Sequence, residues 1–272
     1  MRMVLHCGFH KTGTSSVQRM LERDRALLSA EMQIALKAEI RTAALAARAW
    51  SASGDPAKMS AYIYDLALFF ESLDADDPRP LCLSSEDLCG LMPGRKALRD
   101  YRAAAALLPA LANVACEVFP SADLTFYFST RAPEPWVKSC YAQHLRASGI
   151  RDDFATYRAQ YLPLADLDAD IARINEAMPQ HRVRQAALES MTGRLGPLDP
   201  LLDLVGISAG LRAQIAPLPP ANTSLPQEVR DALLALNRRK MDSGERAARK
   251  QEIVRAARKE QKQSSAPKPL KG

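Results

Sequence analysis

Short apolar runs separated by longer amphipathic stretches set the pattern of this chain. Residues 3–7, 81–85 and 124–129 have the length and composition of buried parallel strands, and residues 182–186 form a weaker one. Between these runs apolar residues recur at helical spacing, most clearly over residues 57–73. Strands that alternate with helices predict a doubly wound parallel sheet in an α/β fold.

Other stretches have weaker patterns. Residues 30–50 are rich in alanine and predict a helix, although residues 32–35 are also compatible with an extended strand. Residues 94–119 predict a helix interrupted near Pro109. The proline-bearing residues 208–226 predict a loop, followed by a charged helical tail.

The turn after the first strand carries the most specific chemistry. Residues 8–16, called the glycine loop below, read Gly8-Phe9-His10-Lys11-Thr12-Gly13-Thr14-Ser15-Ser16. Two glycines let the backbone turn tightly and approach an anion, the lysine supplies a positive charge, and the hydroxyl side chains can donate hydrogen bonds. Between a strand and a helix N-terminus, such a turn predicts a phosphate-binding loop. A simple serine- and threonine-rich helix cap would need neither the lysine nor both glycines.

The order of residues in the glycine loop distinguishes it from a Walker A loop, where the lysine directly follows the second glycine. Here Lys11 comes two residues before Gly13. This order resembles the 5′-phosphosulfate loop of the PAPS-dependent sulfotransferases, in particular bacterial, carbohydrate-type members (PAPS is 3′-phosphoadenosine 5′-phosphosulfate). The resemblance implies an α/β, P-loop-like three-layer fold, with a short central parallel sheet flanked by helices and a C-terminal helical extension.

A second motif follows the third apolar run. Arg131 and Ser139 are eight residues apart, and the pair resembles the 3′-phosphate motif of the sulfotransferases. A guanidinium offers a planar, permanently charged fork for phosphate oxygens. The resemblance therefore implies PAPS as donor, PAP as product and no metal, with lysine in the role that magnesium plays in kinases. The residues expected to bind the donor are Gly8, Lys11, Thr12, Gly13, Thr14, Ser15, Ser16, Arg131 and Ser139.

Transfer of a sulfuryl group to a hydroxyl also needs a base. Glu86 ends the run Leu81-Cys82-Leu83-Ser84-Ser85-Glu86, and a glutamate after a central strand has this role in carbohydrate-type sulfotransferases. An alternative is a helix cap followed by acids in its first turn. His10 is the competing base, and His144 is a weaker candidate. The expected catalytic residues are thus Lys11, Glu86 and His10.

Two further stretches bear on the resemblance. Asn222-Thr223-Ser224 and Leu236-Asn237-Arg238 are similar to segments of many bacterial sulfotransferase-like proteins. The Arg/Lys-x-Gly loop that closes over the adenosine phosphates in better-known members is missing. Gly193-Arg194 and the basic tail are candidates to replace it.

Composition narrows the class of protein. The chain has 272 residues, enough for a full-sized core, and no run of eighteen apolar residues that predicts a transmembrane helix. Its five cysteines include no C-x-x-C pair, which favours free thiols in a reducing compartment over disulfides or zinc. Because the first strand begins almost at Met1, we expect no signal peptide and a cytoplasmic location.

The positive charge is concentrated in the tail. Residues 237–272 contain twelve basic and four acidic residues, whereas the net charge of the whole chain is +6. The body is therefore not a basic surface, and we expect no specific nucleic-acid partner. We expect an α/β domain over residues 1–236, a basic helical extension over residues 237–262 and a disordered tail over residues 263–272. The extension is also a candidate for pairing with a second copy in a homodimer.

Two alternatives to a sulfotransferase remain open at this stage. One is a P-loop kinase or NTPase that uses ATP with Mg²⁺. The other is a degenerate member that binds a nucleotide or a partner without catalysis. The acceptor is expected to be a hydroxyl compound, with a sugar, a lipid-linked glycan and a small alcohol equally compatible with the sequence.

Overall fold

Five parallel strands form one sheet in the order β2-β3-β1-β4-β5. The computed structural model describes residues 1–218 and 225–264, including every side chain in these ranges except those of residues 258 and 260–264. The strands are β1 (Arg2–His6), β2 (Gln33–Ala35), β3 (Leu81–Ser84), β4 (Asp123–Thr130) and β5 (Arg182–Ala187). The predicted parallel sheet is confirmed. The helix predicted over residues 30–50 was wrong in its first part, because β2 occupies residues 33–35, the alternative for that stretch, and the helix begins only at Arg41.

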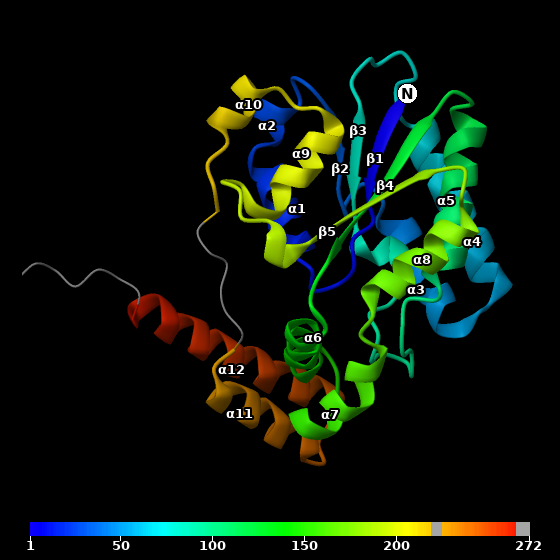
Figure 1. Ribbon diagram of the computed structural model, residues 1–272. Coiled ribbons are helices and arrows are strands. Elements are labelled where there is room, and N and C mark those ends of the chain that lie inside the picture. The colour runs from blue at the N-terminus through cyan, green and yellow to red at the C-terminus, as the bar shows by residue number, and fades with distance from the viewer. Residues whose placement is uncertain (219–224, 265–272) are drawn as a thin grey trace, which may run out of the picture. The chain divides into compact units, whose positions relative to one another are not determined.

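Helices cover both faces of the sheet, as expected for a doubly wound α/β fold (Figure 1). One face carries α1 (Thr14–Arg23), α2 (Arg25–Leu28), α9 (Asp199–Val205) and α10 (Ala209–Gln214). The other carries α3 (Arg41–Ser53), α4 (Pro56–Glu71), α5 (Ala104–Val118) and α8 (Leu167–Ala177). Short 3₁₀ helices are η1 (Glu86–Cys89), η2 (Leu162–Leu164), η3 (Leu188–Ser190) and η4 (Gly196–Leu198).

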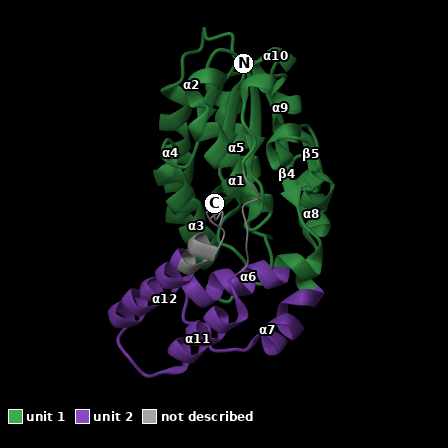
Figure 2. Cartoon of the chain, turned by 90° about the vertical axis from the view of Figure 1, so that its left-hand side faces the viewer, with its two compact units in different colours: residues 1–136, 164–221 green, residues 137–163, 222–272 purple. Residues whose placement is uncertain are grey.

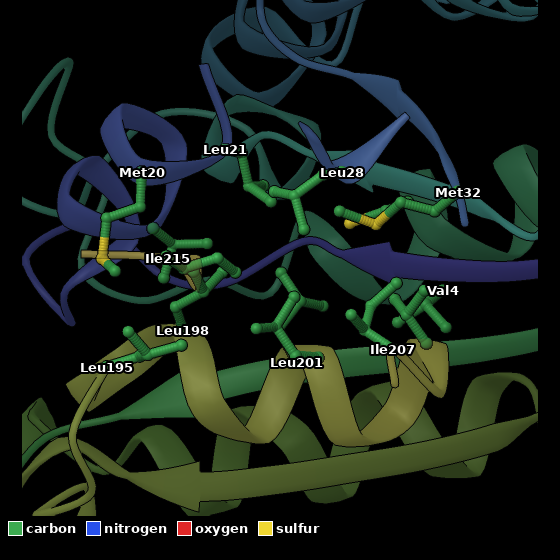
Figure 3. Close-up of a cluster of buried hydrophobic side chains, with 14 of the residues drawn as sticks. Val4, Met20, Leu21, Leu28, Met32, Leu195, Leu198, Leu201, Ile207 and Ile215 are labelled. Atoms are coloured by element: carbon green, nitrogen blue, oxygen red, sulfur yellow. The ribbon is translucent and has the colours of Figure 1, made fainter. Parts of the chain in front are cut away.

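The core explains the continuous apolar runs of the central strands. Val4 of β1 and Cys82 of β3 are buried in one cluster with Leu21 of α1 and Leu201 of α9, and Figure 3 shows side chains of the two helices facing each other across this layer. The neighbouring residues of the same strands are also buried beneath the opposite helices. A strand covered on both faces has no solvent side, so its apolar residues follow one another without alternation.

The chain divides into two compact units, which Figure 2 colours separately. Unit 1 comprises residues 1–136 and 164–221 and contains the sheet, whereas unit 2 comprises residues 137–163 and 222–272. The helices of unit 2 are most of α6 (Pro133–Ala147), α7 (Phe154–Tyr161), α11 (Gln227–Arg238) and α12 (Ser243–Ser264).

Hydrogen bonds within unit 2 tie the basic tail to α6 and the residue that follows it. Asn237 Nδ2 donates to Leu145 O at 3.3 Å, and Lys250 Nζ donates to Ser148 O. Residues 237–264 are therefore grouped with residues 137–163, whereas the sequence pattern suggested a separate extension that begins at residue 237. The predicted domain boundaries themselves remain predictions.

One helix prediction and one loop prediction were also wrong in their limits. α5 begins at Ala104, and the ten residues expected as its first turns form tight turns instead, because Gly94 N donates to Leu98 O across a bend. Pro109 lies inside α5 without ending it. The predicted loop over residues 208–226 contains α10, whose N-cap is Ser208, with its side chain accepting from the amide of Leu211.

The cysteines confirm the expectation of free thiols. None of the five forms a disulfide, and Cys7, Cys82, Cys89 and Cys140 are buried. Burial raises the pKa of the Cys82 thiol to about 12, so the reactive thiolate is suppressed. Across the residues that the structure describes, no helix is both long enough and apolar enough to cross a membrane.

Candidate anion-binding and transfer site

The glycine loop joins β1 to α1 and is closed by hydrogen bonds of its own. Thr12 Oγ1 donates to Phe9 O at 2.6 Å and lies 2.8 Å from Ser129 Oγ of β4. Lys11 has φ 71° and Gly13 has φ 100°, both in the left-handed region. A lysine is uncommon in this region, and such backbone strain is concentrated at functional sites.

The backbone at Gly8 lies on a polar, uncharged floor. A Cβ at this position would lie 2.8 Å from His6 Nε2 and 3.0 Å from the hydroxyl oxygens of Ser129 and Thr14. His6 is buried, and its Nδ1 lies 2.9 Å from Ser84 Oγ. Among the described residues, its Nε2 has no hydrogen-bond partner. Burial lowers the pKa of His6 to about 4, so the ring is neutral near pH 7.

The N-terminus of α1 completes the cradle for an anion. The helix begins at Thr14, directly after Gly13, and no acidic residue lies in its first turn. Its first amides have no acceptor within the helix, and the helix dipole adds positive potential there. Among the predicted hydroxyl donors, Thr12 and Thr14 are buried, Ser16 is half-buried and Ser15 is exposed.

Arg131 lies against the glycine loop from the side of β4. Its Nη1 donates to Lys11 O at 3.2 Å. Trp136 holds the same loop by donating from Nε1 to His10 O at 2.9 Å. A guanidinium therefore lies next to the anion cradle. Ser139, its predicted partner, belongs to unit 2, so the pairing of Arg131 with Ser139 remains a prediction.

Glu86 follows β3, on the other side of β1. Its side chain is 9% exposed; Oε1 accepts from Lys37 Nζ at 2.6 Å and Oε2 accepts from Gln18 Nε2 at 3.0 Å. Burial alone would raise the pKa of Glu86, but the charges of His10 and Lys37 and the hydrogen bond from Lys37 lower it below its usual value. The carboxylate is therefore ionised near neutral pH, with both oxygens engaged.

Asp87 connects the glycine loop to α3. His10 Nε2 lies 3.3 Å from Asp87 Oδ1, and His10 Nδ1 lies 3.0 Å from Tyr101 Oη. Lys37 Nζ lies 3.5 Å from Asp87 Oδ2, and Arg48 Nε lies 3.7 Å from Asp87 Oδ1. Burial alone would raise the pKa of Asp87. The hydrogen bond and charge of His10, together with the charges of Lys37 and Arg48, lower the pKa of Asp87 to about 2.

Replacing Asp87 with asparagine should lower the free energy of unfolding by about 2 kcal/mol near neutral pH. On folding, the pKa of this carboxyl falls from 3.8 to about 2. The stabilisation is therefore complete well above pH 3.8 and is lost as the pH falls through about 2. Urea unfolding at a series of pH values should show wild type and variant converging in acid. A difference that does not change with pH would mean that the effect comes from packing, not charge.

Several residues around the two carboxylates were not predicted from the sequence. They are Gln18, Lys37, Arg48 and Tyr101. Gln18 had a usable signal, because it lies four residues after Thr14 and therefore on the same side of α1. Lys37 had no such signal in the sequence, because it follows the three-residue strand β2, whose place beside β3 depends on the whole sheet.

The other segments of the resemblance lie elsewhere in the chain. Asn222-Thr223-Ser224 lies outside the described residues, so this part of the resemblance stays a prediction. Asn237 is buried in unit 2. Arg194 donates from Nη1 to Ile215 O at 2.6 Å, so the Gly193-Arg194 pair is engaged at the end of α10 rather than at the glycine loop.

Comparisons with known proteins leave the family open. No family model matches the chain, and no curated protein matches it. The structure is similar to the crystal structure of a sulfotransferase from Alicyclobacillus acidocaldarius, at 15% identity and a TM-score of 0.43, over 93% of this chain and 94% of that chain. A likeness at this level carries no argument about activity.

Proposed function

We propose that this chain is a sulfotransferase that moves a sulfuryl group from PAPS to the hydroxyl of an acceptor, with carbohydrates and glycolipids among the candidate acceptors. The observation that carries the proposal is the contact between Arg131 Nη1 and Lys11 O. It places a guanidinium fork beside a loop already suited to an anion. Two adjacent anion sites match the 5′-phosphosulfate and the 3′-phosphate of PAPS, whereas ATP lacks the 3′-phosphate.

Each part of the site has a distinct role in this proposal. Lys11 and the amides of Gly13, Thr14 and Ser15 would hold the 5′-phosphosulfate. Arg131 would hold the 3′-phosphate, with Ser139 as its partner by resemblance. Gly8 fits this role, because a glycine has no Cβ and its backbone can lie close to the polar side chains of His6, Ser129 and Thr14.

The chemistry to be supported is an in-line transfer. The acceptor oxygen forms a bond to sulfur while the bond from sulfur to the bridging oxygen breaks, and PAP leaves with that electron pair. The charge that develops on the leaving oxygen is stabilised by Lys11 and the helix amides, which are already in place before the reaction. The proton of the acceptor hydroxyl passes to a base on the enzyme.

Glu86 is our proposed base. It is ionised near neutral pH, and Lys37 and Gln18 fix its orientation from two sides. It follows β3, whereas Arg131 follows β4, so an acceptor can approach from the side of β1 that the donor leaves open. His10 is the competing base, but each ring nitrogen has one hydrogen-bonding position and both already contact other side chains. Each oxygen of Glu86 accepts one of the hydrogen bonds from Lys37 and Gln18 and keeps a second lone pair for the acceptor hydroxyl.

One observation favours a second candidate, a kinase or NTPase. Two carboxylates directly follow β3, and carboxylates near a phosphate loop hold Mg²⁺ in that class. In this chain Glu86 is paired with Lys37, and Asp87 is close to His10, Lys37 and Arg48. Carboxylates engaged in this way are poor metal ligands, so the sulfotransferase remains the better-supported function.

Replacing Arg131 with alanine should weaken PAP binding by roughly thirtyfold, the equivalent of about 2 kcal/mol for a charge-assisted contact. Isothermal titration calorimetry without metal should show micromolar binding of PAP to the wild type and much weaker binding of ADP. Arg131→Lys should recover only part of the affinity, because an ammonium lacks the planar fork.

Arg184 provides a matched control, since it is an exposed arginine on β5, next to β4. Arg184→Ala should leave PAP affinity unchanged. Equal affinity for PAP and ADP, or tighter binding of Mg-ATP, would contradict the proposal and favour the kinase class. If no nucleotide binds at all, the chain is a sulfotransferase-like protein without the chemistry.

A further inference from the structure

Positive charge exceeds negative charge beside Glu86 and Asp87. Within the described residues, the lysine and arginine side chains that interact with these carboxylates are Lys37, Arg48 and Arg95. Lys37 is engaged by both carboxylates, whereas Arg48 reaches Asp87 alone, at 3.7 Å between Nε and Oδ1. Two carboxylates can balance only two of these three positive charges.

Arg95 is the most weakly paired of these cations among the described residues, since Asp87 attracts it without an ion pair between them. Within the described part of the chain, its Nε is buried and has no hydrogen-bond partner. Its burial and the nearby charge of Arg48 lower the pKa of Arg95. A guanidinium held partly out of water beside a second one is unfavourable until an anion joins them. The arrangement therefore points to a ligand that brings a negative charge.

Close packing of α3 fixes the position of Arg48. Ser51, one turn further along α3, accepts from the amide of Leu91 at 2.9 Å. A Cβ at Gly90 would lie 2.6 Å from Ser51 Cβ, and Gly90 has φ 88°. α3 is thus held against the end of η1, and Arg48 is directed to the same region by helical spacing.

Arg95 begins a turn of unusual backbone geometry. Gly94 N donates to Leu98 O at 2.8 Å, and Leu98 N donates to Arg95 O at 2.9 Å. Between them, Lys96 and Ala97 have φ 51° and 61°. Two consecutive non-glycine residues in the left-handed region are costly, and such strain is concentrated at binding sites. The turn presents Arg95 in a fixed position.

The sheet order separates Arg48 and Arg95 from the proposed donor site. The donor-binding residue Arg131 follows β4, on one side of β1, whereas Asp87, the partner of Arg48, follows β3, on the other side. Asp87 Oδ1 links Arg48 to the glycine loop, because it lies near both Arg48 Nε and His10 Nε2. A hydroxyl acceptor that approaches Glu86 from the side opposite the donor therefore meets these arginines.

We infer that Arg48 and Arg95 form an anion subsite for the acceptor, so that the acceptor is a hydroxyl compound that also carries a carboxylate, sulfate or phosphate group. The inference rests on the proposed function, whose acceptor it specifies. Guanidinium forks bind all three groups through paired, charge-assisted hydrogen bonds. Acidic sugars combine such a group with hydroxyls and belong to the carbohydrate class named in the proposed function.

The test uses the full chain saturated with PAP and four sugars that share one scaffold. Glucuronate, glucose 6-sulfate and glucose 6-phosphate are titrated against glucose by ligand-observed NMR. At least one anionic sugar should bind tenfold or more tightly than glucose. Arg95→Gln and Arg48→Gln should each remove most of this preference while PAP affinity stays unchanged. Arg99→Gln, an exposed arginine of the same loop, should change neither.

The outcomes separate this inference from the proposed function. A wild type that does not bind PAP contradicts the proposed function, and the sugar titration is then repeated without PAP, where a preference lost in Arg95→Gln still supports the anion subsite. Three results overturn the inference: equal binding of glucose and every anionic sugar, a preference that survives both substitutions, or a loss of PAP affinity in Arg95→Gln, which would assign the arginine to the donor. Thermal denaturation verifies that each variant is folded.

Discussion

Replacing Lys11 with alanine should lower kcat by about a thousandfold, the range for removing a group that stabilises charge in a transition state. The lysine precedes the N-terminal turn of α1 and is held in the left-handed region at φ 71°. Its carbonyl accepts from Arg131, so the backbone of the loop is tied in place. An alanine removes the ammonium group alone, because the amides and Arg131 remain.

The ammonium group and the loop amides therefore have different effects, one on kcat and the other on the affinity for PAP. The loop amides and Arg131 hold the donor in its ground state, so PAP affinity should fall by about tenfold or less. The ammonium is needed most when charge develops on the leaving oxygen, so the main loss is in kcat. Steady-state kinetics with PAPS and PAP calorimetry on the same variant separate the two effects.

Lys96 provides the matched control for this substitution. It is also a lysine in the left-handed region, with φ 51°, and it is exposed outside the glycine loop. Lys96→Ala removes the same charge under the same backbone strain, so it should leave PAP affinity unchanged. Lys11→Arg should keep PAP affinity and recover part of kcat. A Lys11→Ala variant with a normal turnover rate would refute the assignment of this loop to the donor.

Much of the fold could be predicted because its signals are local. The strands β1, β3 and β4 are buried on both sides, so their sequences are continuous apolar runs. β5 is mostly exposed, with a polar sequence, and its pattern was correspondingly weak. β2 has three residues, too few to show a period. The order of the strands could not be derived from any of these runs, since pairing brings together segments far apart in the chain.

The candidate site divides in the same way. The glycine loop could be identified because strand, turn and helix N-terminus are consecutive in the sequence. Glu86 and Arg131 could be proposed because each directly follows a predicted strand. Lys37 and Arg48 could not, because they reach the carboxylates only through the placement of β2 and the packing of α3. Arg95 was covered by a helix prediction, whereas the structure has a strained turn there.

Replacing Glu86 with glutamine should lower kcat by about a hundredfold to ten-thousandfold while PAP affinity stays near that of the wild type. The amide has the same shape and can still accept from Gln18, but it cannot take a proton from the acceptor. Lys37 loses its closest carboxylate partner, yet its side chain is 42% exposed, so solvent limits the effect on stability. Glu189→Gln is the matched control, because Glu189 is an exposed carboxylate at the same edge of the sheet, and it should keep normal activity.

The pH profile of the wild type decides between Glu86 and His10. A base must be deprotonated to act, so activity is lost as the pH falls through the pKa of the base. Because the pKa of Glu86 lies below its ordinary value of 4.5, kcat should stay level across neutral pH and decline only in stronger acid. A decline already at about pH 6 to 7 would indicate an imidazole base instead, and His10→Asn would then show the larger loss. If neither variant nor pH alters a measurable transfer rate, Glu86 and His10 both lack the proposed role, and the proton leaves the acceptor by another route.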